Sequence, residues 1–161
     1  MPTMDDAEFD TSFELQQLST AYLTIANARD WKFESPEGKA LASRIAPEYS
    51  EITCAGCIGS DAILERSRQK IAAFPFYHEK LLGISCEFDS KHGTAIVNMH
   101  VRATFDMKST AIEYIREARW RRNYDGKWLV YRVVGIRGIS VVPEHVADIS
   151  AIARLSPDMV A

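Results

Sequence analysis

The chain has 161 residues, of which 47% are hydrophobic, with a formal net charge of −3 and a pI near 5.8. A chain of this length forms one domain whose core needs neither disulfides nor a metal. The acidic balance gives no attraction to nucleic acid, and no segment reads as a signal peptide or a membrane span. We therefore expect a cytoplasmic protein without a nucleic-acid or membrane partner.

Helical signals begin after an acidic stretch over residues 1–10 that we expect to be a flexible tail. Residues 11–14, Thr-Ser-Phe-Glu, have the form of a capping box. Apolar residues then recur at helical spacing, which predicts a first helix that runs to about residue 28.

Two more helices are predicted in the first half. Ser35 followed by Pro36 favours a helix start, and Pro47 is expected to close this second helix. Residues 49–53 read as a short strand, and the glycines after it indicate a loop. A third helix is predicted over residues 60–73.

After residue 75 the hydrophobic period changes to two, which is typical of strands. Four strands joined by short connections are predicted, at residues 80–88, 94–105, 112–124 and 127–138. Helices followed by a run of strands indicate an α+β domain. We place this domain at residues 11–142, followed by a C-terminal extension over 143–161 with a possible short helix.

The last two predicted strands flank Asp125-Gly126, a pair that favours a type I′ turn with Tyr124 opposite Lys127. This register places Arg119 directly across from Arg132. Both faces of the hairpin carry apolar residues, so both need cover. One face also carries charged residues, a mixture that suits a lined pocket. The first face contains Glu113, Ile115, Glu117, Arg119, Val130, Arg132 and Val134, and the second contains Tyr114, Arg116, Ala118, Trp120, Leu129, Tyr131 and Val133.

Three cysteines, an odd number, argue for reduced thiols. Cys54 and Cys57 form a C-x-x-C motif, but further zinc ligands at a matching spacing and a βαβ unit are both missing from the pattern. Loop thiols are the favoured interpretation, and a redox role is the alternative. The chain also has no glycine-rich nucleotide loop and no paired metal motif, so we expect neither a cofactor nor a metal.

The order of these elements, with Arg29-Asp30-Trp31 after the first helix and Asp-Gly-Lys-Trp in the last turn, resembles the nuclear transport factor 2-like superfamily. This superfamily includes SnoaL-like polyketide cyclases, ketosteroid isomerases and scytalone dehydratase. The resemblance implies a cone-shaped α+β barrel, in which a curved mixed or antiparallel sheet wraps a long N-terminal helix and encloses an apolar pocket. It also implies a homodimer through the outer sheet face.

Residues 120–128, WRRNYDGKW, are similar to the equivalent hairpin of scytalone dehydratase. Mapped in this way, Ile115, Glu117 and Arg119 fall on the pocket face, together with alternate residues of the preceding strand from Val97 to Phe105. Ala26, Asn27 and Phe105 stand where that enzyme has catalytic side chains, which argues against dehydration of the scytalone type.

Five residues are candidates for catalysis. Arg119 and Arg132 would stabilise an oxyanion, and Glu117 or His78 would move a proton. Asp30 could be a carboxylate at the pocket rim. The alternatives are a structural ion network for the first three, a strand-edge position for His78 and a local cap for Asp30.

The predicted substrate-binding residues are mostly aromatic and apolar: Tyr22, Trp31, Phe74, Phe76, Met99, Val101, Phe105, Ile115, Trp128 and Val134. Core packing is the competing explanation for each of them. The favoured function is a cofactor-independent isomerase, cyclase or dehydratase acting by acid–base catalysis on an apolar, oxygenated polyketide- or terpenoid-like substrate. The alternative is a non-catalytic ligand-binding or dimeric interaction protein that uses the outer sheet face.

Overall fold

The structure, a computed structural model, describes residues 6–53, 56–106 and 111–137. The predicted C-terminal extension over 143–161 lies outside the described residues. The first helix, α1 (Asp6–Ala28), starts five residues earlier than the capping box suggested. Thr11 lies inside this helix, where its hydroxyl donates to the carbonyl of Ala7 (2.9 Å) instead of capping the N-terminus. Among the described residues, no helix is long and apolar enough to cross a membrane.

The second helix, α2 (Pro36–Ala42), begins as predicted, because the Ser35 hydroxyl accepts a hydrogen bond from the backbone N–H of Gly38 (2.9 Å). Pro47 does not close this helix, contrary to the prediction. It lies within strand β1 (Ile45–Thr53), between Ile45 and Ser50, where the register with the neighbouring strand shifts. Proline lacks a backbone donor, and an irregular stretch of strand tolerates that loss.

The remaining elements follow the predicted order. They are β2 (Gly56–Gly59), α3 (Ser60–Ala73), β3 (His78–Asp89), β4 (Thr94–Thr104), β5 (Ala111–Arg122) and β6 (Trp128–Arg137). β2 is a short strand where a loop was predicted. It pairs antiparallel with β1, so the two glycines that bound it do not prevent pairing.

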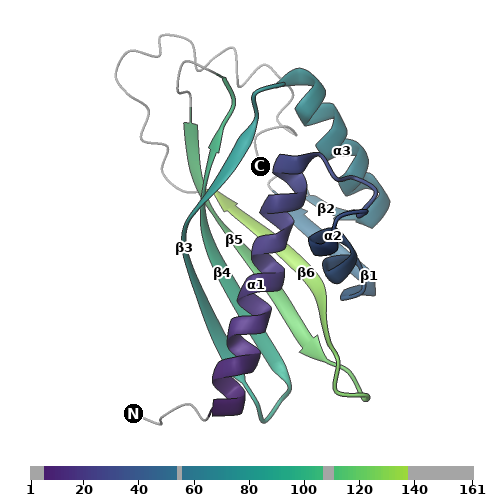
Figure 1. Ribbon diagram of the computed structural model, residues 1–161, viewed down its shortest axis with the longest axis vertical. Coiled ribbons are helices and arrows are strands. Elements are labelled where there is room, and N and C mark those ends of the chain that lie inside the picture. Colours follow the sequence, from purple (N-terminus) through teal and green to yellow (C-terminus); the bar gives the residue numbers. More distant parts are fainter. Residues whose placement is uncertain (1–5, 54–55, 107–110, 138–161) are drawn as a thin grey trace.

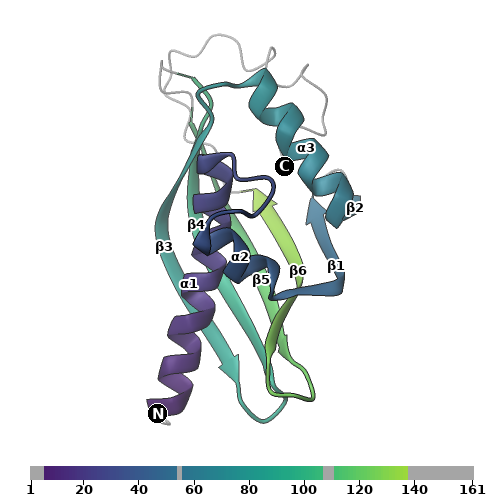
Figure 2. The same ribbon diagram turned by 45° about the vertical axis from the view of Figure 1, so that its right-hand side comes forward.

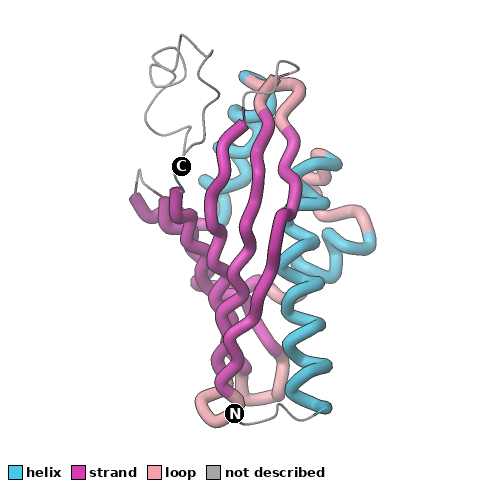
Figure 3. Tube along the Cα trace, turned by 90° about the vertical axis from the view of Figure 1, so that its left-hand side faces the viewer, coloured by secondary structure: helices cyan, strands magenta, loops and turns pink. Residues whose placement is uncertain are grey.

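All six strands form one sheet in the order β2-β1-β6-β5-β4-β3. β1 and β6 pair in parallel, and the other neighbours are antiparallel. The sheet bends around α1, and α3 lies over the end formed by β1 and β2 (Figures 1 and 2). The helices cover one face of the sheet, and no described helix covers the other (Figure 3). The expected cone-shaped α+β fold is therefore confirmed.

The β5–β6 turn differs from the predicted type I′ turn. Gly126 has a φ of 85°, whereas Arg29 and Phe33 are the only non-glycine residues with positive φ in the described ranges, so Asp125 is not left-handed. The Asn123 carbonyl accepts from Gly126 (3.1 Å) and the Asn123 N–H donates to the Lys127 carbonyl (2.9 Å), a three-residue loop closed by a glycine bulge.

The longer loop shifts the register near the turn by one residue, so that Arg122 pairs with Trp128. An irregularity between Arg119 and Trp120 then restores the predicted register, and Arg119 does pair with Arg132. The extra residue on β6 is Tyr131, which separates the inward-facing Val130 from Val133.

Pairing with β4 decides which face of β5 is buried. Val97, Met99 and Val101 of β4 are almost completely buried, as predicted, and they pair with Ala118, Arg116 and Tyr114. The concave face of β5 therefore carries Tyr114, Arg116, Ala118 and Trp120. The prediction that Ile115, Glu117 and Arg119 face inward is wrong.

Candidate functional site

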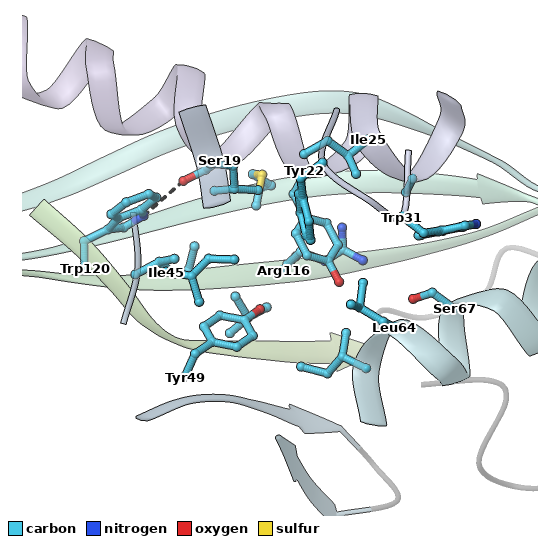
Figure 4. A pocket seen from close by; sticks show the side chains of 18 residues that line it. Ser19, Tyr22, Ile25, Trp31, Ile45, Tyr49, Leu64, Ser67, Arg116 and Trp120 are labelled. Carbon is cyan, nitrogen blue, oxygen red and sulfur yellow. Dashed lines mark hydrogen bonds between the residues drawn. The ribbon is translucent and has the colours of Figure 1, made fainter. Parts of the chain in front are cut away.

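An apolar cavity of about 100 Å³ lies between α1, α3 and the concave face of the sheet. Ile25 of α1, Leu41 of α2 and Ile63 of α3 form its helical wall, and Val130 and Val133 belong to its sheet wall. Figure 4 shows Tyr22, Arg116 and Trp31 together towards one end, and Trp120 at the opposite end. The indole N–H of Trp120 donates to the Ser19 hydroxyl (3.1 Å), which fixes that end.

The only charged side chain lining this cavity within the described ranges is Arg116 of β5, which is buried. Its two terminal nitrogens donate to the two carboxylate oxygens of Glu79 on β3 (3.2 and 3.3 Å). The guanidinium also lies 4.5 Å from the ring centroid of Tyr22 and 5.4 Å from that of Tyr114. A buried cation needs such partners, because the loss of its hydration without compensation costs on the order of several kcal/mol.

Glu79 is the anionic centre of this network. Its carboxylate accepts from the Tyr114 hydroxyl (2.6 Å) and also from the Tyr77 hydroxyl. Burial opposes its ionisation, but Arg116, Lys70 and the two hydroxyls outweigh burial and lower its pKa to about 2. Glu79 is therefore a permanent anion near neutral pH and a poor proton acceptor. Its role is to hold Arg116 and two tyrosines in place.

The tyrosines around the cavity remain protonated. Burial is the main cause that raises the pKa of Tyr22 and Tyr49, and the nearby carboxylate of Glu51 adds to it. Glu51 lies two residues after Tyr49 on β1, and its carboxylate is 3.5 Å from the Tyr22 hydroxyl. The Tyr49 hydroxyl can thus donate a hydrogen bond to a ligand oxygen, whereas the Tyr22 hydroxyl donates to Glu51.

The end of α1 is anchored to β3 beside the ion pair. The Asn27 amide donates to the backbone carbonyl of Glu79 (2.7 Å) and accepts from its N–H (2.8 Å). Arg29, left-handed with a φ of 59°, donates to the carbonyl of Tyr77 (2.8 Å). Phe33 has a φ of 55°, and such conformations cost about 1 kcal/mol or more each. This constrained turn places Trp31 and Phe33 in the cavity wall.

A second cavity of about 40 Å³ adjoins the first. It shares with the first cavity the side chains of Tyr22, Ala26, Trp31, Ile63, Ser67 and Arg116. Its other walls include the charged Glu51, Lys70 and Glu79, beside Ile58 and Ile71. The two cavities together form a hollow that is apolar at one end and charged at the other.

The predicted catalytic residues Glu117, Arg119 and Arg132 do not line either cavity. Glu117 and Arg119 form an ion pair with each other (2.5 Å) on the convex face, and 38% of the Arg119 side chain is exposed. The Nε atom of Arg132 is buried without a hydrogen-bond partner among the described residues. The structural ion network, weighed as the alternative, describes the Glu117–Arg119 pair.

The other two predicted catalytic residues also lie outside the cavities. His78 is exposed at the start of β3, in the strand-edge position considered as its alternative. The Asp30 carboxylate accepts from the N–H groups of Glu34 (2.8 Å) and Ser35 (2.9 Å) and from the Ser35 hydroxyl (2.5 Å). These hydrogen bonds, that of Ser35 first, lower the Asp30 pKa. Asp30 is a local cap.

Three of the predicted substrate-binding residues, Tyr22, Trp31 and Met99, do line the first cavity. The others lie elsewhere. Val101, Phe105 and Trp128 are buried in the core; Phe74 packs edge-on against Phe105 (5.1 Å); Phe76 is exposed; and Ile115 and Val134 belong to the convex face.

No cluster of three or more His, Cys, Asp or Glu side chains that could hold a metal exists in the described part of the chain. Cys57 is exposed on β2, and Cys54 lies outside the described residues.

The charged residues of the candidate site that the sequence analysis missed are Arg116, Glu79, Glu51 and Lys70. A signal for one of them exists. Glu79 and Leu81 alternate on β3 and Tyr77 immediately precedes this strand, so Glu79 occupies an inward position between apolar neighbours. A carboxylate in such a position requires a buried cation, and Arg116 on the inward face of β5 supplies it.

No protein-family model matches the chain, and no curated protein matches its sequence. Among solved structures 205 chains match, so the fold is common and by itself says little about the reaction. An NTF2-like protein of unknown function from Pseudomonas putida has a TM-score of 0.62 at 14% identity, covering 86% of this chain and 92% of that chain.

Two further neighbours carry names of enzymes. A hexachlorocyclohexane dehydrochlorinase from Novosphingobium barchaimii has a TM-score of 0.61 at 17% identity, covering 80% of this chain and 92% of that chain. A protein from Shewanella frigidimarina, proposed to be a ketosteroid isomerase, has a TM-score of 0.56 at 10% identity, covering 73% and 90%. The chain therefore has the nuclear transport factor 2-like fold, and the predicted resemblance is confirmed at the level of the fold.

Proposed function

We propose that the protein is a cofactor-independent enzyme that catalyses a proton-transfer reaction, an isomerisation, cyclisation or elimination, on a small apolar molecule bearing oxygen. The observation that carries this proposal is the buried Arg116 guanidinium at the boundary of the apolar cavity. A fixed cation in a dry site stabilises negative charge that develops on a substrate oxygen, which is the largest contribution to many such barriers.

The surrounding groups complete the roles. Glu79 holds Arg116 through two hydrogen bonds, and the remaining N–H groups of the Arg116 guanidinium stay available to a ligand. The protonated hydroxyl of Tyr49 donates to the same oxygen, and the Tyr22 hydroxyl donates to Glu51. Glu51, a half-buried carboxylate on the wall of the adjoining cavity, moves the proton. Glu51 and Arg116 thus take the roles first assigned to Glu117 and Arg119.

The size of the cavity limits the substrate. An engineered cavity of about 150 Å³ binds benzene, so a cavity of about 100 Å³ suits a portion of a molecule no larger than one ring. A polyketide- or terpenoid-like molecule of natural-product biosynthesis would fit only if it were small or presented one ring to this hollow.

Proton exchange tests the proposal without knowledge of the natural substrate. Small cyclic ketones are incubated with the protein in D₂O, and loss of the proton next to the carbonyl is followed by NMR. We expect catalysed exchange that Glu51→Gln lowers at least tenfold, whereas the matched convex-face variant Glu117→Gln keeps the wild-type rate. Absence of exchange for the whole panel, or equal rates for both variants, would refute the proposal.

Arg116 needs a separate design, because Arg116→Met alone leaves the Glu79 carboxylate buried without its partner. The double variant Glu79→Gln/Arg116→Met removes both charges and keeps the volume of the site. We expect it to fold and to lose exchange, while Arg119→Met on the convex face retains exchange. A folded double variant with undiminished exchange would show that the cation has no part in the reaction.

We also propose that the convex sheet face pairs with a second copy of this chain. Its apolar residues include Ile136, which is 50% exposed, and Ile115. It also carries both charge signs, because Glu113 binds Arg102 (2.6 Å) and His100 (2.9 Å), so two copies related by a two-fold axis can match opposite charges. Size-exclusion chromatography with light scattering should give a dimer, and Ile136→Asp a monomer. A monomeric wild-type protein would refute this pairing. If the protein also bound ligands without catalysing exchange, a non-catalytic binding protein would remain as the function.

A further inference from the structure

Proton transfer to or from a ketone uses Glu51 and Arg116 of the charged cavity, but it gives no role to Lys70. This cavity is lined by three cations, Arg66, Lys70 and Arg116, against two carboxylates, Glu51 and Glu79. It adjoins the apolar cavity, because Tyr22 and Trp31 line both. A molecule whose hydrocarbon part fills the apolar cavity would therefore extend its polar end here.

The cations Arg116 and Lys70 of this cavity differ in their ion-pair partners. Arg116 is paired with Glu79, and Glu79 is saturated, because two tyrosine hydroxyls bind it as well. Lys70 forms no ion pair with a described residue. Its ammonium instead lies 5.0 Å from the ring centroid of Tyr77. Lys70 is thus a half-buried cation on α3 whose neighbours supply a π face but no close counter-charge.

We infer that the ligand of this hollow is a small apolar acid, with one ring or its equivalent in the apolar cavity and a carboxylate between Lys70 and Arg116. The inference rests on the proposed function only in placing the ligand in the same hollow. Lys70 supplies a point charge, and Arg116 still has N–H groups that Glu79 does not occupy. The anion also gives Lys70 a close counter-charge, which no described residue supplies.

The titration of Lys70 agrees with this arrangement. Burial is the main cause that lowers its pKa, opposed by Glu79 and Glu51, and Arg116 and Arg66 add to the decrease. A bound carboxylate would favour the charged ammonium. The titratable and charged groups that line this cavity beside Lys70 are those of Tyr22, Glu51, Arg66, Tyr77, Glu79 and Arg116. Binding of the acid should weaken as the pH rises through the pKa of Lys70, because the ammonium then loses its charge.

The test compares benzoate with benzamide, which has nearly the same shape but no charge. Binding is measured by isothermal titration calorimetry at neutral pH on the full chain. We expect benzoate to bind at least tenfold more tightly than benzamide. Lys70→Met should weaken benzoate at least tenfold and leave benzamide unchanged, whereas Arg68→Met, which removes an exposed cation from the same helix, should change neither.

Thermal unfolding confirms that both variants are folded before binding is compared. Equal affinities for benzoate and benzamide, absence of benzoate binding, or equal benzoate affinities in the wild type and Lys70→Met would overturn the inference. Proton exchange of ketones separates it from the proposed function. Exchange without preference for the acid refutes only the carboxylate site, and preference for the acid without any exchange refutes only the enzyme.

Discussion

The buried carboxylate of Glu79 should make the stability of the fold depend on acid pH. Its pKa is about 2 in the folded protein, against an ordinary value of 4.5. A pKa lowered by folding contributes stability that is fully present above the unfolded value and is lost as the pH falls through the folded one. The difference between the two values corresponds to about 3 kcal/mol, of which roughly 2 kcal/mol is lost between about pH 5 and pH 3.

Urea unfolding followed by tryptophan fluorescence measures this loss. The free energy of unfolding is compared between the wild type and Glu79→Gln at each pH. Carboxylates present in both proteins, such as Asp30, cancel in the difference. At neutral pH the wild type should be more stable than Glu79→Gln by about 3–5 kcal/mol, because the substitution leaves Arg116 without its counter-charge. We expect this difference to shrink by about 2 kcal/mol at the lower pH.

Glu65→Gln is the matched control, because it removes an exposed carboxylate from α3. Its difference from the wild type should stay near zero across the same pH range. The reasoning would be refuted if the difference in unfolding free energy between the wild type and Glu79→Gln stayed constant within about 0.5 kcal/mol between the two pH values. The ionised carboxylate would then contribute nothing specific to the folded state.

Three other substitutions test the structure around the site. Asn27→Asp removes the donor to the Glu79 carbonyl and adds a negative charge beside it, so the free energy of unfolding should fall by about 1–3 kcal/mol in urea titration; an unchanged value would contradict the anchoring role. Gly38→Ala should destabilise, because a Cβ there would lie 2.5 Å from an Asp30 carboxylate oxygen, whereas Gly59→Ala, with open space, is the control; equal melting temperatures would count against the contact. Asp30→Ala should lower the melting temperature through lost capping bonds while ketone exchange per folded molecule persists, and a loss of exchange would restore a catalytic role for Asp30.

The architecture could be predicted because its signals are local. Ser35 and Pro36 specify the start of α2 through one side-chain cap, and the period of two after residue 75 marks the strands without knowledge of their partners. The same locality explains the errors. Pro47 ends helices in isolation, but here it falls on an irregular stretch of β1, whose shape depends on β6.

The inward face of β5 could not be deduced from its own sequence, because charged residues occur on both faces. Arg116 and Arg119 are equivalent in local pattern. What separates them is the pairing with β4 and the presence of Glu79 on β3, which lies 37 residues before Arg116. The loop between Asn123 and Lys127 added a second uncertainty, since its extra residue shifts the register until the irregularity at Tyr131 corrects it.

The parallel pairing of β1 with β6 has a consequence for synthesis on the ribosome. Ser50 pairs with Arg132, and translation of the intervening stretch takes roughly 4–16 s at ordinary rates. During this interval the nascent β1–β2 hairpin presents one edge with unpaired backbone groups to any neighbouring chain. Slower translation in this stretch should prolong that exposure and increase aggregation of the newly made protein.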